Sequence, residues 1–233
     1  LGTDHHEYIL TKNDILNIIP NLSNVYSEPF ADPSQIPMIF LAKQARQIVK
    51  VILSGDGADE LFGGYSRYKF AIKVWNLLSF APHLLQKFFQ NYINNQSTKN
   101  LNQKFNFLEK YFNSFGNSHS IGDRLKKGSK LLAKNDFKNF YESLISVWEN
   151  DLSSNRTLGY RPYQQIVDDH LLTNKLAWMS HMDRKIYLSD NILVKLDRST
   201  MAEGLEGRVP FIDKRICEFS LKGLIKNSKI FGN

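Results

Sequence analysis

Ser54-Gly-Asp-Gly-Ala-Asp-Glu-Leu-Phe-Gly-Gly-Tyr65 is the stretch that decides the fold of this chain. It follows the apolar and partly β-branched run at 49–53, which predicts a buried strand, and a helix is expected to begin near Asp59. Glycines at this change from strand to helix permit unusual backbone conformations and the close approach of a ligand. Backbone N–H groups at such a turn suit anionic or phosphate groups, and open α/β sheets bind ligands at the carboxyl ends of their strands. The stretch therefore predicts a ligand-binding loop.

The same loop carries three carboxylates, Asp56, Asp59 and Glu60. Asp56 and Asp59 are three residues apart, so one helical turn could bring both near one point. Carboxylates beside phosphates indicate Mg²⁺, which usually takes one or two of them. The alternative is an ordinary turn with an acidic helix start, which the helix dipole also favours. An EF-hand is excluded by the spacing of the oxygen ligands.

Outward from the loop, the pattern predicts a strand at 7–11, a helix with a capped start at 11–14 and a helix at 38–48. From Tyr65 onward the spacing of apolar residues is mostly helical, with an amphipathic helix at 105–115. A long helix is expected at 171–186, followed by another capped by Ser189 or Asp190. This order predicts an α/β fold with a partial parallel sheet and a predominantly helical remainder. Only two strands are visible, so we expect the sheet to be incomplete within this chain.

Length and composition favour a folded chain of one domain or slightly more. The chain has 233 residues, 42% of them hydrophobic, and no apolar run approaches the roughly 18 residues of a membrane helix. No secretory signal is visible, although the first residue is not methionine and the natural N-terminus is expected upstream. Cys217 is the only cysteine, which fits a reducing compartment and a cytoplasmic protein, and its neighbours predict a buried structural thiol.

The net charge of +7 raises the possibility of a nucleic-acid partner. Residues 83–150 hold ten Lys/Arg against five Asp/Glu, which gives +5 of that excess. A cluster at Arg124, Lys126, Lys127 and Lys130 could contact RNA or phosphate, but a solvated helical face explains it more simply. Nucleic-acid binding is therefore the less favoured interpretation, and the aromatic residues at 105–115 are expected in a core.

The motif from Ser54 to Tyr65 resembles the second signature of the asparagine synthetase family, Ser-Gly-(Asp/Glu)-Gly-x-Asp-Glu-(Leu/Val)-Phe-Gly-Gly-Tyr. The segment 1–7, Leu-Gly-Thr-Asp-His-His-Glu, is similar to the one that follows the family's first nucleotide-binding strands. Residues 190–201 and 205–213 resemble the family's third block. The three blocks occur in the family's order and together span nearly the whole chain.

The resemblance implies an incomplete synthetase domain over residues 1–233 with a Rossmann-like ATP-pyrophosphatase fold, similar to the adenine nucleotide alpha hydrolases. Residues 1–68 would form its α/β nucleotide-binding part and residues 69–233 its mainly helical part. In the family, aspartate reacts with ATP and Mg²⁺ to give β-aspartyl-AMP and pyrophosphate, and ammonia then displaces AMP. A separate N-terminal domain releases that ammonia from glutamine. The expected partners are therefore ATP, aspartate, ammonia and this glutaminase domain, with a homodimer possible.

The resemblance also assigns roles to the loop. Ser54, Gly55 and Gly57 would contact the nucleotide, and Asp59 would help to hold Mg²⁺. Asp56 matches an acidic position linked to formation of the intermediate, and we hypothesise that it takes a proton from the attacking ammonia.

The third block allows both substrate-binding and structural roles. Arg208 could pair with a carboxylate or phosphate, and Glu206 is expected to be structural. Asp197 and Arg198 could meet the substrate or form an ion pair, and Asp213 is expected to cap the next helix.

The chain also departs from the family. The Ser-Gly-Gly-x-Asp-Ser pyrophosphate loop, the glutaminase cysteine and the C-terminal active-site lysine do not occur in it. We expect an internal fragment that is inactive by itself. The alternatives are a relative that amidates a sugar, a peptide or another carboxylate, and a non-catalytic interaction or nucleic-acid-binding fragment.

Overall fold

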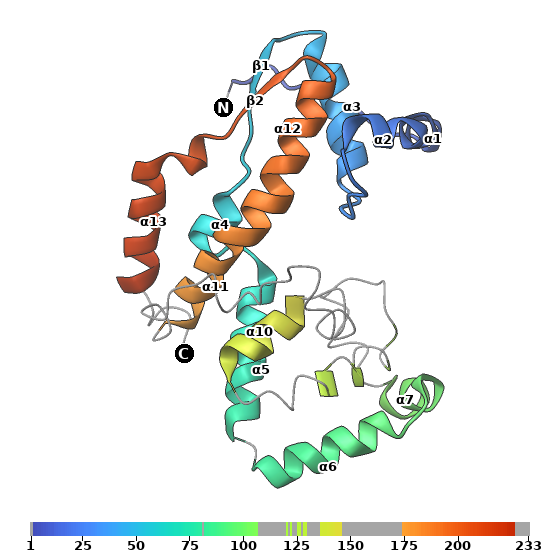
Figure 1. The fold of residues 1–233 in the computed structure, drawn as a ribbon, viewed down its shortest axis with the longest axis vertical. Helices are drawn as coiled ribbons and strands as arrows, with labels where there is room; N and C mark the ends of the chain where they lie inside the picture. Colours follow the sequence, from blue (N-terminus) through green and yellow to red (C-terminus); the bar gives the residue numbers. More distant parts are fainter. Residues whose placement is uncertain are drawn as a thin grey trace. The chain divides into compact units, whose positions relative to one another are not determined.

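The fold is that of a computed structural model, which describes residues 2–80, 82–106, 120, 122, 125–126, 128–129, 136–145 and 174–226. Expectations for the helix at 105–115 beyond position 106, and for most of the basic cluster at 124–130, fall outside these residues. Within them the chain is mostly helical, with a small parallel sheet of two strands, β1 (Val51–Leu53) and β2 (Glu206–Arg208) (Figure 1). Among the described helices, none combines the length and the hydropathy of a membrane span.

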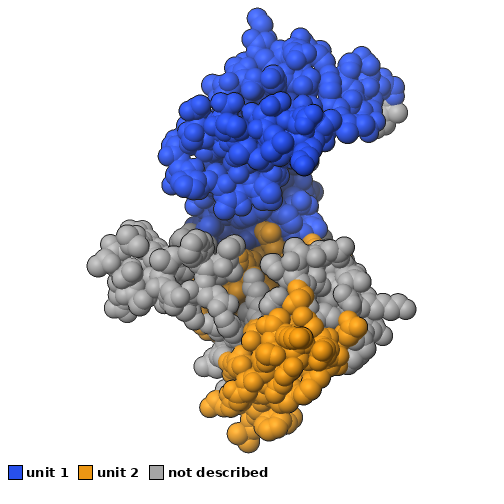
Figure 2. All heavy atoms as spheres, turned by 90° about the vertical axis from the view of Figure 1, so that its right-hand side faces the viewer, with its two compact units in different colours: residues 1–65, 180–229 blue, residues 66–179, 230–233 orange. Residues whose placement is uncertain are grey.

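The chain divides into two compact units, coloured separately in Figure 2. Unit 1 comprises residues 1–65 and 180–229, and unit 2 comprises residues 66–179 and 230–233. The segment that the sequence groups as a helical part, 69–233, is thus shared between both units. Our assignment of domains from the sequence stays a prediction.

Unit 1 begins with a helix that the sequence predicts. Thr11 caps α1 (Lys12–Ile18) because its side chain accepts a hydrogen bond from the Asp14 N–H, while the Asp14 side chain accepts one from the Thr11 N–H. This reciprocal capping box satisfies two backbone donors at the helix start. The strand expected at 7–11 is wrong, since residues 2–10 have no regular secondary structure. The helix expected at 38–48 is present as α3 (Gln35–Arg46), and short helices at 19–21 and 22–25 precede it.

The two strands pair in parallel, with Ile52 opposite Gly207. β1 confirms the strand expected at 49–53, but the expectation that it is buried is wrong, since Val51 is 40% exposed and Leu53 is 73% exposed. The second strand lies at 206–208, where no strand was expected. A short Glu-Gly-Arg segment carries no alternation of apolar side chains that could reveal it.

A long helical segment supports this sheet. It runs without a break through α11 (Lys175–Asp183), a π-helix (Arg184–Ile192) and α12 (Leu193–Ala202). The expected helix start at Ser189 or Asp190 is therefore wrong: the Ser189 hydroxyl donates to the Lys185 carbonyl inside the helix, at 2.8 Å. α12 ends at Ala202, and Gly204, with a φ of 64°, lets the chain turn into β2.

The sheet leads at both ends into short helices. α4 (Ala58–Phe62) follows β1, and a 3₁₀ turn (Pro210–Ile212) follows β2. Asp213 then caps α13 (Lys214–Lys226) as expected, because its carboxylate accepts a hydrogen bond from the Arg215 N–H at 2.9 Å. Cys217 in α13 is partly rather than fully buried.

Unit 2 is helical in its described part. It contains α5 (Ser66–Phe80), α6 (His83–Asn94), α7 (Thr98–Phe105), α10 (Phe137–Ile145) and the beginning of α11. Its core is aromatic: Trp75, Phe137, Phe140, Tyr141 and Trp178 lie with neighbouring ring centroids between 5.4 and 6.3 Å apart.

Candidate functional site

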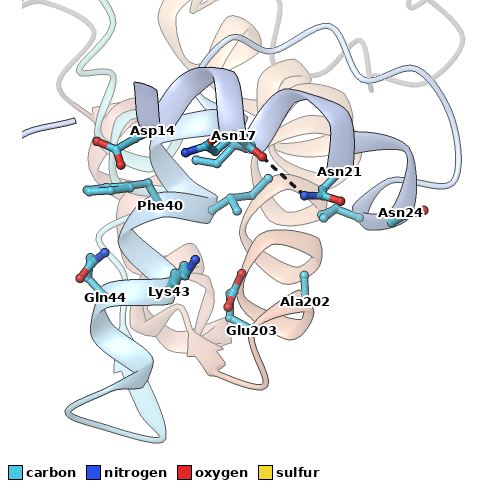
Figure 3. A pocket seen from close by; sticks show the side chains of 12 residues that line it. Asp14, Asn17, Asn21, Asn24, Phe40, Lys43, Gln44, Ala202 and Glu203 are labelled. Carbon is cyan, nitrogen blue, oxygen red and sulfur yellow. Dashed lines mark hydrogen bonds between the residues drawn. The ribbon is translucent and has the colours of Figure 1, made fainter. Parts of the chain in front are cut away.

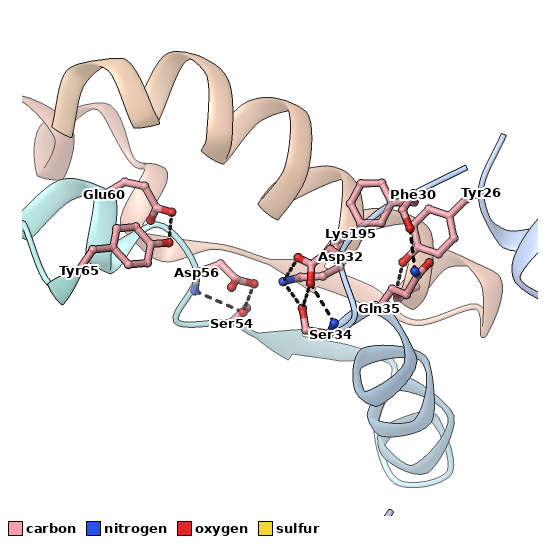
Figure 4. Close-up of polar contacts among 11 residues, drawn as sticks. Tyr26, Phe30, Asp32, Ser34, Gln35, Ser54, Asp56, Glu60, Tyr65 and Lys195 are labelled. Carbon is pink, nitrogen blue, oxygen red and sulfur yellow. Dashed lines mark hydrogen bonds and ion pairs between the residues drawn. The ribbon is translucent and has the colours of Figure 1, made fainter. Parts of the chain in front are cut away.

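The loop after β1 is held by its own side chains and by β2. The Ser54 N–H donates to the Arg208 carbonyl at 2.8 Å, which continues the strand pairing by one residue. The Ser54 hydroxyl donates to Asp56 Oδ2 at 2.7 Å and accepts a longer bond from the Asp56 N–H at 3.4 Å (Figure 4). The other carboxylate oxygen of Asp56, Oδ1, has no donor among the described residues. The loop is thus ordered while one oxygen stays available.

The two glycines of the loop have different reasons to be glycine. Gly57 is buried and has a φ of 85°, a left-handed conformation that strains other residues. A Cβ there would also meet Ile212 at 3.5 Å and the Leu188 side chain of the π-helix at 3.7 Å. Gly55 needs no positive φ and faces open space, with no heavy atom within 4 Å of a Cβ. Only Gly55 therefore borders free volume in which a ligand could lie.

The three carboxylates lie in three different environments. Asp56 precedes α4 and is outside it, so the spacing of three does not place it on one helical turn with Asp59. Asp59 is exposed, and no described residue donates to its carboxylate. Glu60 is only 1% exposed and accepts a hydrogen bond from the Tyr65 hydroxyl at 2.5 Å, while Tyr65 packs edge-on against Tyr187. Of the two acidic residues within α4, Asp59 is thus the one that remains accessible to a cation.

α4 has five residues, which limits what its first turn can contribute. The macrodipole of so short a helix is small, because few peptide dipoles are aligned in it. Phosphate binding at this position would therefore depend on individual N–H groups of the loop. The helix itself is anchored: the Ser180 hydroxyl donates to the Glu60 carbonyl. The helix that follows the loop is therefore held in place by another segment of unit 1.

Arg208 and Glu206 of the third block lie on one face of β2. Their ion pair joins Arg208 Nε to Glu206 Oε1 at 2.8 Å, with both side chains more than half exposed. Exposed pairs of this kind contribute about 0–1 kcal/mol, so its role is local. Gly207 points the other way, toward α12, because successive residues of a strand alternate between faces.

Asp197 and Arg198 are exposed on α12. The ion pair expected as one alternative does not form, and neither side chain is paired with another described residue. The structure does not join them to the Ser54–Gly57 loop through any hydrogen bond among the described residues. Their assignment to substrate stays a prediction.

No sequence pattern predicts the buried ion pair between Lys195 on α12 and Asp32 in the loop before α3. Lys195 Nζ lies 3.2 Å from Asp32 Oδ2, and their side chains are 9% and 11% exposed. The ammonium also donates to the Ser34 hydroxyl at 2.8 Å, and Ser34 in turn donates to Asp32 (Figure 4). Burial by itself would raise the pKa of the Asp32 carboxyl, but the Ser34 hydrogen bonds and the Lys195 charge together hold that pKa below its usual value.

The same loop has a second attachment to α12. The Tyr26 hydroxyl and the Ser199 hydroxyl are hydrogen-bonded at 2.8 Å in a buried position, and Tyr26 stacks on Phe30 with centroids 4.8 Å apart. Gln35 donates to the Phe30 carbonyl at 2.8 Å. The loop 26–34 is therefore fixed on α12. No local pattern reveals the contacts of this loop with α12, because Tyr26–Ser199 and Asp32–Lys195 are each more than 160 residues apart in the chain.

A groove of about 430 Å³ lies elsewhere in unit 1, between the first helices, α3 and the end of α12 (Figure 3). Polar side chains such as Asn17, Asn24, Lys43, Gln44 and Glu203 line it. It contains none of the residues that the sequence assigns to the site. We therefore retain the Ser54–Gly57 loop as the candidate functional site.

Similarity to known proteins identifies the family of this chain. The sequence profile of the family described as asparagine synthase matches residues 1–230. The chain belongs to this family. It is 30% identical over 223 residues to a putative glutamine-hydrolyzing asparagine synthetase of Mycobacterium tuberculosis, covering 93% of this chain and 30% of that protein.

A second relative, the glutamine-hydrolyzing asparagine synthetase 1 of Bacillus subtilis, is 29% identical over 233 residues, covering 95% of this chain and 32% of that protein. A putative asparagine synthetase of Methanocaldococcus jannaschii is 46% identical over 63 residues, or 27% of this chain and 12% of that protein. The chain thus spans about a third of the length of the first two relatives. No solved structure matches it.

The residues of the loop fit the groups that the family implies. Among the described residues, no three His, Cys, Asp or Glu side chains converge on one point. Mg²⁺ does not require such a cage, because it is usually held by one or two carboxylates together with phosphate oxygens and water. The exposed Asp59 carboxylate and the open space beside Gly55 meet that requirement.

Proposed function

We propose that the chain is the ATP-using part of a glutamine-hydrolysing asparagine synthetase. The observation that carries the proposal is the Ser54–Gly57 loop at the carboxyl end of β1, tied to β2 by the bond from Ser54 to Arg208, in a chain that matches the family over residues 1–230. Ligands of parallel α/β sheets bind at this end of the strands. The substrates are ATP, aspartate and ammonia released from glutamine by another domain of a longer protein.

In the proposed reaction, a side-chain carboxylate oxygen of aspartate attacks the α-phosphorus of ATP. The bond from that phosphorus to the pyrophosphate oxygen breaks, which gives β-aspartyl-AMP and pyrophosphate. Ammonia then attacks the acyl carbon, and the C–O bond to AMP breaks with its electron pair leaving on AMP. Mg²⁺, when bound, neutralises charge on the leaving pyrophosphate.

The chain's own residues have distinct parts in this scheme. Ser54 and Gly55 form the part of the turn whose backbone approaches the nucleotide, Gly57 holds the turn in its left-handed conformation, and Asp59 offers a carboxylate to Mg²⁺. Asp56 accepts the proton that the ammonia nitrogen loses, at Oδ1, because Oδ2 already accepts from the Ser54 hydroxyl. That hydrogen bond fixes the orientation of the base.

The proposal includes a Rossmann-like sheet with more strands than these two. Parallel sheets are normally covered on both faces, yet Leu53 in β1 is 73% exposed. In the proposed fold, other segments of a longer protein cover this face. The cytoplasm as location and a homodimer as assembly remain expectations from the sequence.

Aspartate-dependent release of pyrophosphate from ATP tests the proposal. The protein is the full-length product of the reading frame that contains this chain, supplied with Mg²⁺ and with ammonium in place of glutamine. We expect release that requires aspartate and falls by at least about 100-fold in Asp59→Ala, given typical effects of lost electrostatic groups. Asp56→Asn should still release pyrophosphate from aspartate and ATP but form no asparagine.

Glu218→Ala is the matched control, because it removes a half-exposed carboxylate on α13 outside the loop. It should turn over normally. ATP binding without any response to aspartate would contradict asparagine synthesis. In that case a response to a sugar, a peptide or another carboxylic acid would identify a different acceptor.

A further inference from the structure

Gly64 lies directly against Asp59. α4 is capped by Gly63, whose φ of 69° turns the chain back so that the Gly64 N–H donates to the Asp59 carbonyl at 3.0 Å. A Cβ placed on Gly64 would overlap Asp59 Oδ1 and would lie 3.1 Å from the Asp59 Cγ. Its three nearest heavy atoms all belong to Asp59.

Backbone conformation does not explain this glycine. The described glycines with positive φ are Gly2, Gly57, Gly63 and Gly204, and Gly64 is not among them. Dense core packing does not explain it either, since Gly64 is exposed. What the missing side chain provides is room for one group, the Asp59 carboxylate.

We propose that Gly64 is a positioning residue that keeps the Asp59 carboxylate oriented for Mg²⁺ in the nucleotide site. This inference rests on the proposed function and deepens it. Gly64 touches no substrate in this scheme, and it acts only through the rotamer of Asp59.

The carboxylate is the group that moves when a methyl group is added at position 64. Its oxygen is the end of a side chain with no partner among the described residues, whereas the nearest backbone atom, the Asp59 Cα, stays 3.4 Å from the new Cβ. Rotation of the side chain therefore relieves the overlap at little cost in stability. The expected defect is in Mg²⁺ binding and not in folding.

Equilibrium binding of ATP to the full-length protein, measured with Mg²⁺ and with excess EDTA, separates these effects. In Gly64→Ala we expect the Mg²⁺ concentration for half-maximal enhancement of ATP binding to rise about 10- to 100-fold, as for other residues that orient a metal ligand. Affinity in EDTA and the thermal midpoint should match those of the natural protein. Gly223→Ala is the control, because it adds the same methyl group on α13 with no heavy atom within 4 Å.

A double-mutant cycle with Asp59→Ala decides whether the effect passes through Asp59. Once the carboxylate is gone, Gly64→Ala should change Mg²⁺ dependence no further, and any loss of thermal stability caused by Gly64→Ala should disappear. A natural Mg²⁺ response in Gly64→Ala, or a further loss in the double variant, would overturn the inference. If Asp59→Ala itself keeps the natural Mg²⁺ response, the Mg²⁺ role in the proposed function fails as well, so the two failures are distinguishable.

Discussion

Among single residues, Lys195 and Asp32 form an ion pair that is buried in unit 1. Both charges are nearly removed from water, and Ser34 satisfies the ammonium and the carboxylate together. Replacing such a pair by apolar residues can be neutral, but removing one partner leaves a buried charge uncompensated. The pair thus ties the loop before α3 to α12.

Asp32→Asn is expected to lower the free energy of unfolding by about 3–5 kcal/mol at neutral pH, because the Lys195 ammonium loses its counter-charge. The folded pKa of Asp32 lies below its usual value of about 3.9, so the stabilisation is complete above that pH and is lost as the pH falls through the folded pKa. The difference in the free energy of unfolding between Asp32→Asn and the natural protein should therefore shrink below about pH 4. Denaturant unfolding at several pH values measures it.

Asp197→Asn provides the matched comparison, since it removes an exposed and unpaired carboxylate two residues after Lys195. It should change the free energy of unfolding by less than about 0.5 kcal/mol. Adding Lys195→Met to Asp32→Asn should recover most of the loss. Equal effects of the two Asp→Asn changes would show that the buried pair is no more important than a surface charge.

Among the elements, β2 and α12 are in unusually close contact. A Cβ on Gly207 would lie 3.3 Å from the Leu196 Cγ and from the Thr200 Oγ1. The glycine therefore allows β2 to pack directly on α12. Because β2 pairs with β1, this contact also positions the strand from which the Ser54–Gly57 loop emerges.

Gly207→Val should destabilise unit 1 by about 1–3 kcal/mol, because a branched side chain in this space forces strand and helix apart. Thermal unfolding followed by circular dichroism is the measurement. Gly223→Val introduces the same side chain on α13, where a Cβ meets open space, and should leave the midpoint nearly unchanged. A natural midpoint in Gly207→Val would mean that the strand is not held against α12.

Elements with local signals were predictable, and elements defined by distant contacts were not. The Thr11 cap and the apolar run of β1 are visible in the sequence, as is the helix start after Gly57. β2 is a strand only because it pairs with a segment about 150 residues earlier, and the π-helix changes hydrogen-bond register without a change in composition. The consecutive apolar residues at 8–10 favour a strand, but no described strand pairs with this segment.

The candidate site follows the same rule. Its motif residues are contiguous, so the loop could be located from the sequence. The burial of Glu60 could not, because it depends on Tyr65 and on Ser180 from a segment 120 residues away. The Lys195–Asp32 pair could not be predicted from the sequence for the same reason, because its partners are 163 residues apart.

At the scale of the whole molecule, two compact units share one polypeptide that passes from unit 1 to unit 2 near residue 65 and returns near residue 180. Chains with more than one unit often unfold in more than one step. The three tryptophans, at positions 75, 148 and 178, all belong to the segment 66–179. Tryptophan fluorescence therefore reports chiefly on unit 2, whereas far-ultraviolet circular dichroism reports on both.

We expect the two units to unfold in separable transitions. Phe140 is fully buried beside Trp75 in unit 2, so Phe140→Ala should cost about 3–5 kcal/mol and shift the fluorescence transition. Asp32 and Lys195 both lie in unit 1. Asp32→Asn should therefore shift the unit 1 transition, which is seen by circular dichroism, and leave the fluorescence transition in place. If both variants moved the fluorescence transition equally, the two units would unfold as one. A core substitution that destabilises unit 2 would then also unfold the Ser54–Gly57 loop in unit 1.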